Sequence, residues 1–153
     1  MALFDGYDVA TSGMGAQRTR INIVSANIAN AQTTHTAEGG PYKKQNVVFE
    51  EILLNKQQKN TQEPVANSSE SSSQRPLSGV GIKEIIDAKG EPLMKYEPNH
   101  PDANEDGYVA YPNINPVIEM VDLIEAMRSY EANVSAFTTQ KGIDTQTLDI
   151  LKG

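Results

Sequence analysis

Residues 115–134 read NPVIEMVDLIEAMRSYEANV and begin the longest helical pattern in the chain. Asn115 suits an N-cap and Pro116 suits the first helical position, because an asparagine side chain accepts a backbone hydrogen bond and proline needs no donor there. Apolar residues then recur at alternating steps of three and four, which is the spacing of one helix face. This pattern predicts a helix from Pro116 to Leu151, about 54 Å long at 1.5 Å per residue. Its apolar face comprises Met120, Leu123, Met127, Tyr130, Val134, Phe137, Leu148 and Leu151.

A second helical pattern occupies residues 1 to about 32, at the other end of the chain. Its apolar positions again alternate by three and four, as in a coiled-coil seam. Gly6, Gly13 and Gly15 each disfavour a helix by roughly 1 kcal/mol relative to alanine. We therefore expect this helix to be marginal alone and to need a packing partner. Its apolar face comprises Tyr7, Ala10, Met14, Ile21, Val24 and Ile28.

The region between the two helical patterns has a different composition. Residues 41–49 favour an extended conformation, and residues 50–54 fit either a strand or a short helix. Only three of the 25 residues from 55 to 79 are apolar, and a serine-rich run lies among them. We interpret residues 55–79 as a solvated, flexible loop, because such a composition cannot bury enough apolar surface to order itself.

Three short strands are expected after this loop. Residues 80–86 and 93–97 are spaced so that they could pair as a hairpin, and residues 108–111 form a further candidate strand. The fold predicted for the whole chain is mainly α with a small β part. The two terminal helices pair as an antiparallel coiled-coil-like hairpin, with the β-rich insertion and the loop between them. Because two helices share only one seam, each should still present apolar residues outward.

Composition excludes several classes of function. Lys and Arg number 13 against 20 Asp and Glu, which gives a formal net charge of −7 and argues against nucleic-acid binding. No window is apolar enough to span a membrane, so no membrane insertion is expected. The chain has no Cys and only two His, so we expect no disulfide, metal or other cofactor. The carboxylates do not converge with a nucleophile or a base, and we expect no enzyme activity.

One motif leaves an alternative open. Asp102–Gly107 matches the first half of a calcium-binding loop, in which carboxylate and amide oxygens alternate before a glycine. The twelfth position of that loop should be a bidentate glutamate, and Asn113 stands there. The simpler interpretation is a turn rich in Asp and Asn that leads into a short strand. A calcium-binding regulatory module is therefore the alternative function to test.

Two stretches of the chain resemble the signatures of the bacterial flagellar basal-body rod proteins. Residues 12–33, SGMGAQRTRINIVSANIANAQT, resemble the N-terminal signature of that family, and residues 115–134 resemble its C-terminal signature. Residues 39–43 and 96–113 resemble stretches found in its proximal-rod members. Asn27 and Asn30 lie inside the first signature, where we expect them to bond neighbouring backbone and fix the helix exit.

The resemblance implies a structural subunit of the proximal rod, assembled with copies of itself and with neighbouring rod and basal-body proteins. Residues 1–35 and 113–153 would form the inner tube, and residues 36–112 would form the outer region. The tube would transmit torque and pass exported subunits. The chain itself would leave the cytoplasm through the flagellar type III export machinery, without a cleaved signal peptide, and reach the periplasm. The assembly interface would consist of the apolar residues named for both helices, together with Asn27 and Asn30.

Overall fold

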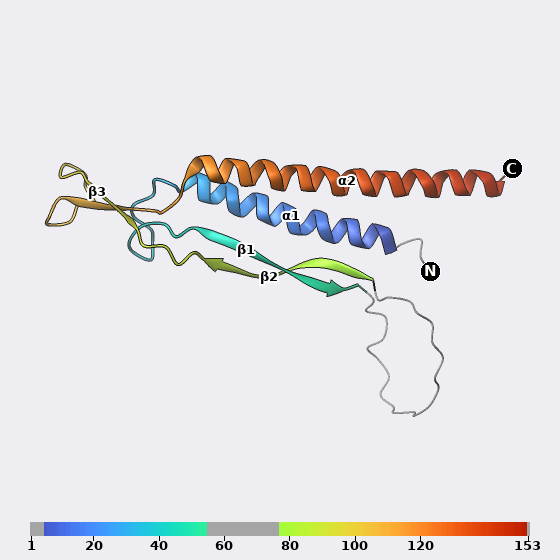
Figure 1. Cartoon of the computed structure of the whole chain (residues 1–153), viewed down its shortest axis with the longest axis horizontal. Coiled ribbons are helices and arrows are strands. Elements are labelled where there is room, and N and C mark those ends of the chain that lie inside the picture. Colours follow the sequence, from blue (N-terminus) through green and yellow to red (C-terminus); the bar gives the residue numbers. More distant parts are fainter. Residues whose placement is uncertain (1–4, 55–76, 153) are drawn as a thin grey trace, which may run out of the picture.

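The computed structural model describes residues 5–54 and 77–152. Two helices and four strands make up an elongated molecule, in which the helix pair runs along the long axis and the strands lie beneath it and beyond one end (Figure 1). In chain order the elements are α1 (Asp5–Ala29), β1 (Gln45–Leu53), β2 (Ser78–Asp87), β3 (Leu93–Tyr96), β4 (Tyr108–Tyr111) and α2 (Pro116–Lys152).

Helices α1 and α2 pack side by side in opposite directions, as the sequence predicts. Asn27, near the end of α1, bonds Glu119 in the first turn of α2. Tyr7, near the start of α1, bonds Asp144 far along α2. The start of α1 and the end of α2 therefore lie at the same end of the molecule (Figure 1). At the start of α2, the Asn115 side chain accepts a hydrogen bond from the Val117 amide, which confirms the predicted N-cap.

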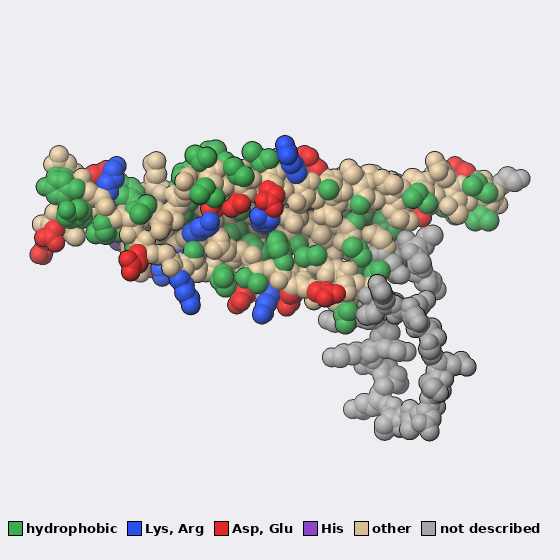
Figure 2. Space-filling view, viewed as in Figure 1, with side chains coloured by type: hydrophobic (Ala, Val, Ile, Leu, Met, Phe, Trp, Pro, Cys, Tyr) green, Lys and Arg blue, Asp and Glu red, His purple; other side chains and the backbone are tan. Residues whose placement is uncertain are grey.

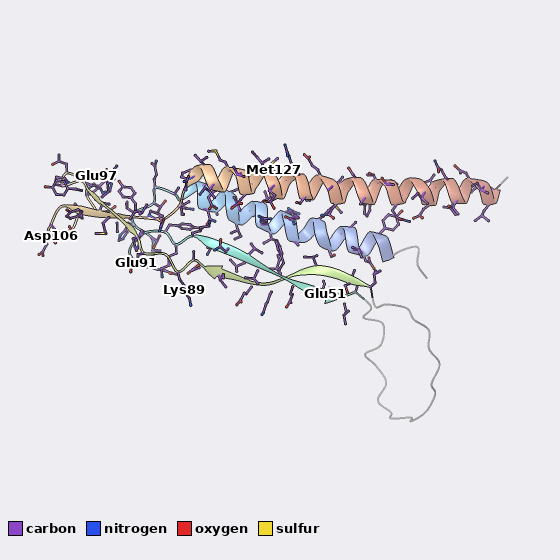
Figure 3. The ribbon with its side chains drawn as sticks, viewed as in Figure 1. Glu51, Lys89, Glu91, Glu97, Asp106 and Met127 are labelled. Carbon is purple, nitrogen blue, oxygen red and sulfur yellow. The ribbon has the colours of Figure 1, made fainter. Side chains whose placement is uncertain are left out.

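The strands form two separate antiparallel pairs. β1 pairs with β2 from Gln45 opposite Asp87 to Leu53 opposite Ser78, with a bulge between Val48 and Phe49. This pair runs along α1 on the side away from α2 (Figure 1). The shorter β3–β4 pair extends beyond the end of the helix pair, where Figure 3 shows Glu97 and Asp106.

The predicted hairpin between residues 80–86 and 93–97 is wrong. β2 has a partner of nine residues in β1, whereas β3 is only four residues long, so pairing with β1 gives β2 far more ladder hydrogen bonds. β3 pairs with β4 instead, and the side chain of Val109 in β4 is fully buried. The pairing depends on partners distant in the sequence, which local turn signals do not reveal.

The predicted loop 55–79 also ends two residues too late, because Ser78 and Gly79 already belong to β2. A Cβ atom at Gly79 would lie 2.6 Å from the Ser12 Oγ, so only glycine lets β2 approach α1 this closely. The Ser12 hydroxyl in turn accepts a hydrogen bond from the Val80 amide. Most of the predicted loop, residues 55–76, lies outside the described residues.

In its first turns, the face that α2 turns toward α1 is one position away from the predicted apolar face, whereas the two faces coincide farther along, at Phe137. Ala126 is fully buried, whereas Met120 and Met127 are about half exposed. A Cβ atom at Gly13 would lie 2.9 Å from the Asn133 Oδ1, which shows how closely the helices approach. Small residues on α1 permit this approach. Because the two helices lie so close together, only small side chains of α2 fit between them.

This close contact predicts that Ala126 tolerates no enlargement. Ala126→Leu should reduce the free energy of unfolding by about 1–3 kcal/mol, because the added carbons would push the helices apart. Urea unfolding followed by circular dichroism measures the change. Ala132 is exposed on the same helix, so Ala132→Leu is the matched control and should change stability by less than about 0.5 kcal/mol. Equal effects of the two substitutions would contradict the close contact.

Candidate functional site

A buried polar cluster joins α1, the start of β1 and the first turn of α2. At its centre is Asn27, whose side chain is fully buried. The Asn27 Nδ2 donates to the Gln45 carbonyl at 2.9 Å, and the Gln45 amide donates to the Asn27 Oδ1 at 2.9 Å. The amide side chain thus pairs with the backbone of Gln45 as a neighbouring strand would. This double hydrogen bond fixes where β1 begins relative to α1.

Glu119 supplies the negative charge of the cluster and is 1% exposed. Its carboxylate accepts a hydrogen bond from the Asn27 Nδ2 at 3.1 Å and lies 2.5 Å from the Lys44 Nζ. A buried carboxylate is stable only when it is paired and hydrogen-bonded, and both conditions are met here. Its place in the first turn of α2 adds the favourable field of the helix N-terminus. The cluster therefore holds three segments together.

Tyr42 and Asn30 complete the exit of α1. The Tyr42 hydroxyl donates to the Asn27 Oδ1 at 3.2 Å, and burial together with the negative charges of Asp87 and Glu119 raises the pKa of Tyr42. The Asn30 Nδ2 donates to the Ala26 carbonyl at 2.9 Å. Asn30 thus caps the helix exit locally, as predicted. Asn27 differs from the expectation, because its partners lie across the fold rather than in neighbouring backbone.

The opposite end of the helix pair is held by Tyr7. Its hydroxyl donates to the Asp144 Oδ2 at 2.6 Å, and its ring meets Phe137 edge to face with the ring centres 4.9 Å apart. This hydrogen bond, with burial and the negative charge of Asp144, raises the pKa of Tyr7. The structure therefore brings Tyr7 and Phe137, both named on the predicted apolar faces, into direct contact.

The first three turns of α2 carry a large exposed apolar surface. Six side chains there are between 47% and 67% exposed, although each is large and apolar. Figure 2 shows hydrophobic side chains gathered over the start of α2. Side chains of this kind rarely gather on the surface of a monomer unless another molecule covers them. The six are Val117, Ile118, Met120, Val121, Ile124 and Met127, and we call them the outer patch.

The predicted interface residues fall into three groups. Four are exposed and available to another molecule: Met120, Met127, Leu148 and Leu151. Three are already buried within the chain: Ala10, Val24 and Asn27. The rest are partly buried: Tyr7, Met14, Ile21, Ile28, Asn30, Leu123, Tyr130, Val134 and Phe137.

Sequence reasoning missed Lys44 and the role of Glu119, and it left most of the outer patch off the predicted interface. The signal for Glu119 is an acidic residue inside an apolar stripe. The signal for the outer patch is the apolar widening of that stripe at Val117, Val121 and Ile124.

Asp102–Gly107 forms a turn rich in Asp and Asn, as the simpler interpretation of the sequence predicts. The Asn104 Oδ1 accepts hydrogen bonds from the amides of Asp106 and Tyr108, and Gly107 has a φ of 81°. The Asp102 Oδ2 accepts a hydrogen bond from the Thr34 hydroxyl at 2.7 Å. These oxygens are engaged in holding the turn that leads into β4. In the described ranges no group of three or more His, Asp or Glu is placed to hold a metal, and nothing there supports the calcium alternative.

Comparison with known proteins gives the class of this helix-paired chain. The family described as "Flagella basal body rod protein" matches residues 8–34, which include most of α1. The family described as "Flagellar basal body rod FlgEFG protein C-terminal" matches residues 105–150, which include β4 and nearly all of α2. Both halves of the helix pair thus match flagellar rod proteins. Within the described residues no helix is long and apolar enough to cross a membrane.

Curated relatives over the full length identify the branch of that class. The flagellar basal-body rod protein FlgC of Borreliella burgdorferi is 38% identical, covering 100% of both chains. FlgC of Aquifex aeolicus is 40% identical over 99% of each chain. FlgC of Bacillus subtilis is 36% identical over 99% of this chain and 100% of its own. The chain belongs to the FlgC family of flagellar basal-body rod proteins.

The buried cluster predicts a large effect of substituting Asn27. Asn27→Ala should lower the free energy of unfolding by at least about 2 kcal/mol, because it removes both hydrogen bonds to the Gln45 backbone and leaves the buried Glu119 carboxylate with Lys44 alone. Asn22 lies exposed on the same helix, and Asn22→Ala should change stability by less than about 0.5 kcal/mol. Denaturant unfolding of both variants makes the comparison. An Asn27→Ala protein as stable as the Asn22→Ala protein would refute the role of the cluster.

The contact between Tyr7 and Asp144 predicts a dependence on alkaline pH. Because the pKa of Tyr7 is raised in the folded chain, the stability gained from this contact is present below the usual tyrosine pKa and is lost as pH rises through the raised value. Asp144→Asn should lower the pKa of Tyr7. NMR titration of labelled tyrosine measures it, with Asp149→Asn as the control that leaves it unchanged. An unaltered Tyr7 titration in Asp144→Asn would contradict the contact.

Proposed function

We propose that this structural subunit of the flagellar basal-body rod is built into the proximal rod through its helix pair, and that its neighbours include copies of itself. The outer patch is the observation that carries this proposal. Burying a large apolar side chain contributes roughly 1.5–3 kcal/mol, so covering six half-exposed ones adds substantially to assembly.

The helix pair and the strands take different places in the proposed rod. The terminal segments 1–35 and 113–153 form the inner tube, and residues 36–112 form the outer region. The arrangement of the elements supports this division, because the β1–β2 pair covers α1 on the side away from α2 (Figure 1). A tube walled by paired helices transmits torque along its axis and leaves a channel through which exported subunits pass.

Export in an unfolded state fits the small size of the core. Within the described residues only six hydrophobic side chains are buried. A chain with so small a core gains little from folding alone, and it gains more when neighbours cover its exposed apolar residues. We propose that the chain passes unfolded through the flagellar type III export machinery without a cleaved signal peptide, folds in the periplasm and gains its full stability on assembly.

The location of the chain tests the proposed function most simply. Basal bodies purified from cells that make this chain should contain its peptides at levels near those of the other rod components, by quantitative mass spectrometry. A chain that is abundant in the soluble fraction and absent from basal bodies would contradict the proposal.

The outer patch predicts a specific defect in assembly. Val121→Asp should leave the isolated chain folded, because Val121 is 61% exposed, but should prevent incorporation into the rod by placing a charge in a buried contact. Incorporation is measured by immunoblotting of purified basal bodies. Ile85 on β2 is 46% exposed, and Ile85→Asp is the matched control in the proposed outer region. Normal incorporation of Val121→Asp, or an equal loss with Ile85→Asp, would overturn the assignment of the tube to the helices.

A further inference from the structure

Two of the five methionines of the chain lie in the outer patch. Met120 is 50% exposed and Met127, which is labelled in Figure 3, is 47% exposed. They are seven residues apart, so helical spacing places them on one side of α2, with Ile124 between them. Ala126, by contrast, is fully buried on the side that α2 turns toward α1. Both methionines therefore belong to the assembly surface and not to the core.

Methionine is the side chain of this protein that a peroxide oxidises most readily, because the sequence contains no cysteine and no tryptophan. The methionine sulfur forms a bond to one oxygen of hydrogen peroxide, the O–O bond breaks, and the other oxygen leaves as water with both protons. The sulfur loses two electrons and the peroxide gains them. The product is methionine sulfoxide, which is polar, whereas the original thioether is apolar and flexible.

The methionines of the described residues differ in their access to solvent. Met14 on α1 is partly buried, whereas Met94 on β3 is 57% exposed. A peroxide in solution should therefore reach Met94, Met120 and Met127 before it reaches Met14. Met94 lies outside the outer patch, on the short strand pair beyond the helices. It has the same chemistry and a similar exposure at another place, which makes it a matched control.

A sulfoxide in the outer patch would oppose the covering of that patch. None of its six side chains can donate a hydrogen bond, because all of them are Val, Ile or Met. A sulfoxide oxygen that is buried against such side chains loses its hydrogen bonds to water and gains none in return, which is unfavourable. In a free copy the same oxygen still reaches water. Oxidation should therefore leave the fold intact and weaken assembly.

We propose that Met120 and Met127 form an oxidation site that controls entry into the rod. Hydrogen peroxide converts both thioethers to sulfoxides in free copies, and oxidised copies are excluded from assembly. A methionine sulfoxide reductase reverses the change, because a dithiol supplies two electrons, becomes a disulfide and releases the oxygen as water. Copies already in the rod are protected by the neighbour that covers the patch. This inference rests on the proposed function and adds a means of regulating it.

Peptide mass spectrometry tests the reactivity of the two side chains. The purified chain, treated with dilute hydrogen peroxide, should gain one oxygen at Met120 and one at Met127 before Met14 is oxidised. Its circular dichroism spectrum should not change. Oxidation of Met14 first, or a loss of helical signal when only Met120 and Met127 are oxidised, would overturn the proposal.

Substitutions test the effect on assembly without an oxidant. Met120→Gln together with Met127→Gln imitates the polarity of two sulfoxides and should reduce incorporation into basal bodies about tenfold or more. Met94→Gln makes the same change outside the patch and should incorporate normally. Circular dichroism of each purified variant should match that of the unaltered chain. Normal incorporation of the double Gln variant, or an equal loss with Met94→Gln, would overturn the proposal.

A competition in one cell tests the oxidation itself. Cells make the unaltered chain together with a chain that carries Met120→Leu and Met127→Leu, which stays apolar and cannot be oxidised at these positions. Peroxide should lower the share of the unaltered chain among newly incorporated copies, as measured by mass spectrometry of basal bodies. An unchanged share would overturn the oxidation site and leave the proposed function standing. The proposed function fails separately, if the unaltered chain is absent from basal bodies of untreated cells.

Discussion

The hydrogen bonds of the Asn27 side chain are the constraint on which the rest of the structure depends. A single buried amide pairs with the backbone of Gln45, accepts from Tyr42 and donates to Glu119. The Glu119 charge is then balanced by Lys44. Three segments that are far apart in the sequence are thereby fixed at one point. Because buried polar groups need all of their partners, few other arrangements of these segments satisfy the same atoms.

The position of α2 follows from the hydrogen bonds of Asn27 and from the close contact of α2 with α1. Glu119 anchors its first turn, Ala126 packs tightly against α1, and the bond between Tyr7 and Asp144 holds the far end. With this face committed to α1, the large apolar side chains of the outer patch turn outward. The same helix thus uses one face for folding and keeps another for assembly, which suits a chain that gains its full stability only among neighbours.

The sequence predicted the helices well because their signals are local. The cap at Asn115 and the steps of three and four placed α2 within one residue of its observed end. The strand pairing could not be predicted, because the partner of β2 is separated from it by a long polar stretch. The contact face was missed by one position at the start of α2, because close packing against α1 favours a small side chain such as Ala126 over large apolar ones. The partners of Asn27 were missed because residue type alone does not reveal whether an amide bonds locally or across the fold.

An electron cryomicroscopy reconstruction of intact basal bodies that contain this chain tests the central claim most directly. The account predicts α1 and α2 as paired helices in the inner wall of the rod, with the outer patch covered by a neighbouring subunit. It also predicts that the β1–β2 and β3–β4 pairs lie farther from the channel. Strands lining the channel, or an outer patch facing solvent in the assembled rod, would contradict the account.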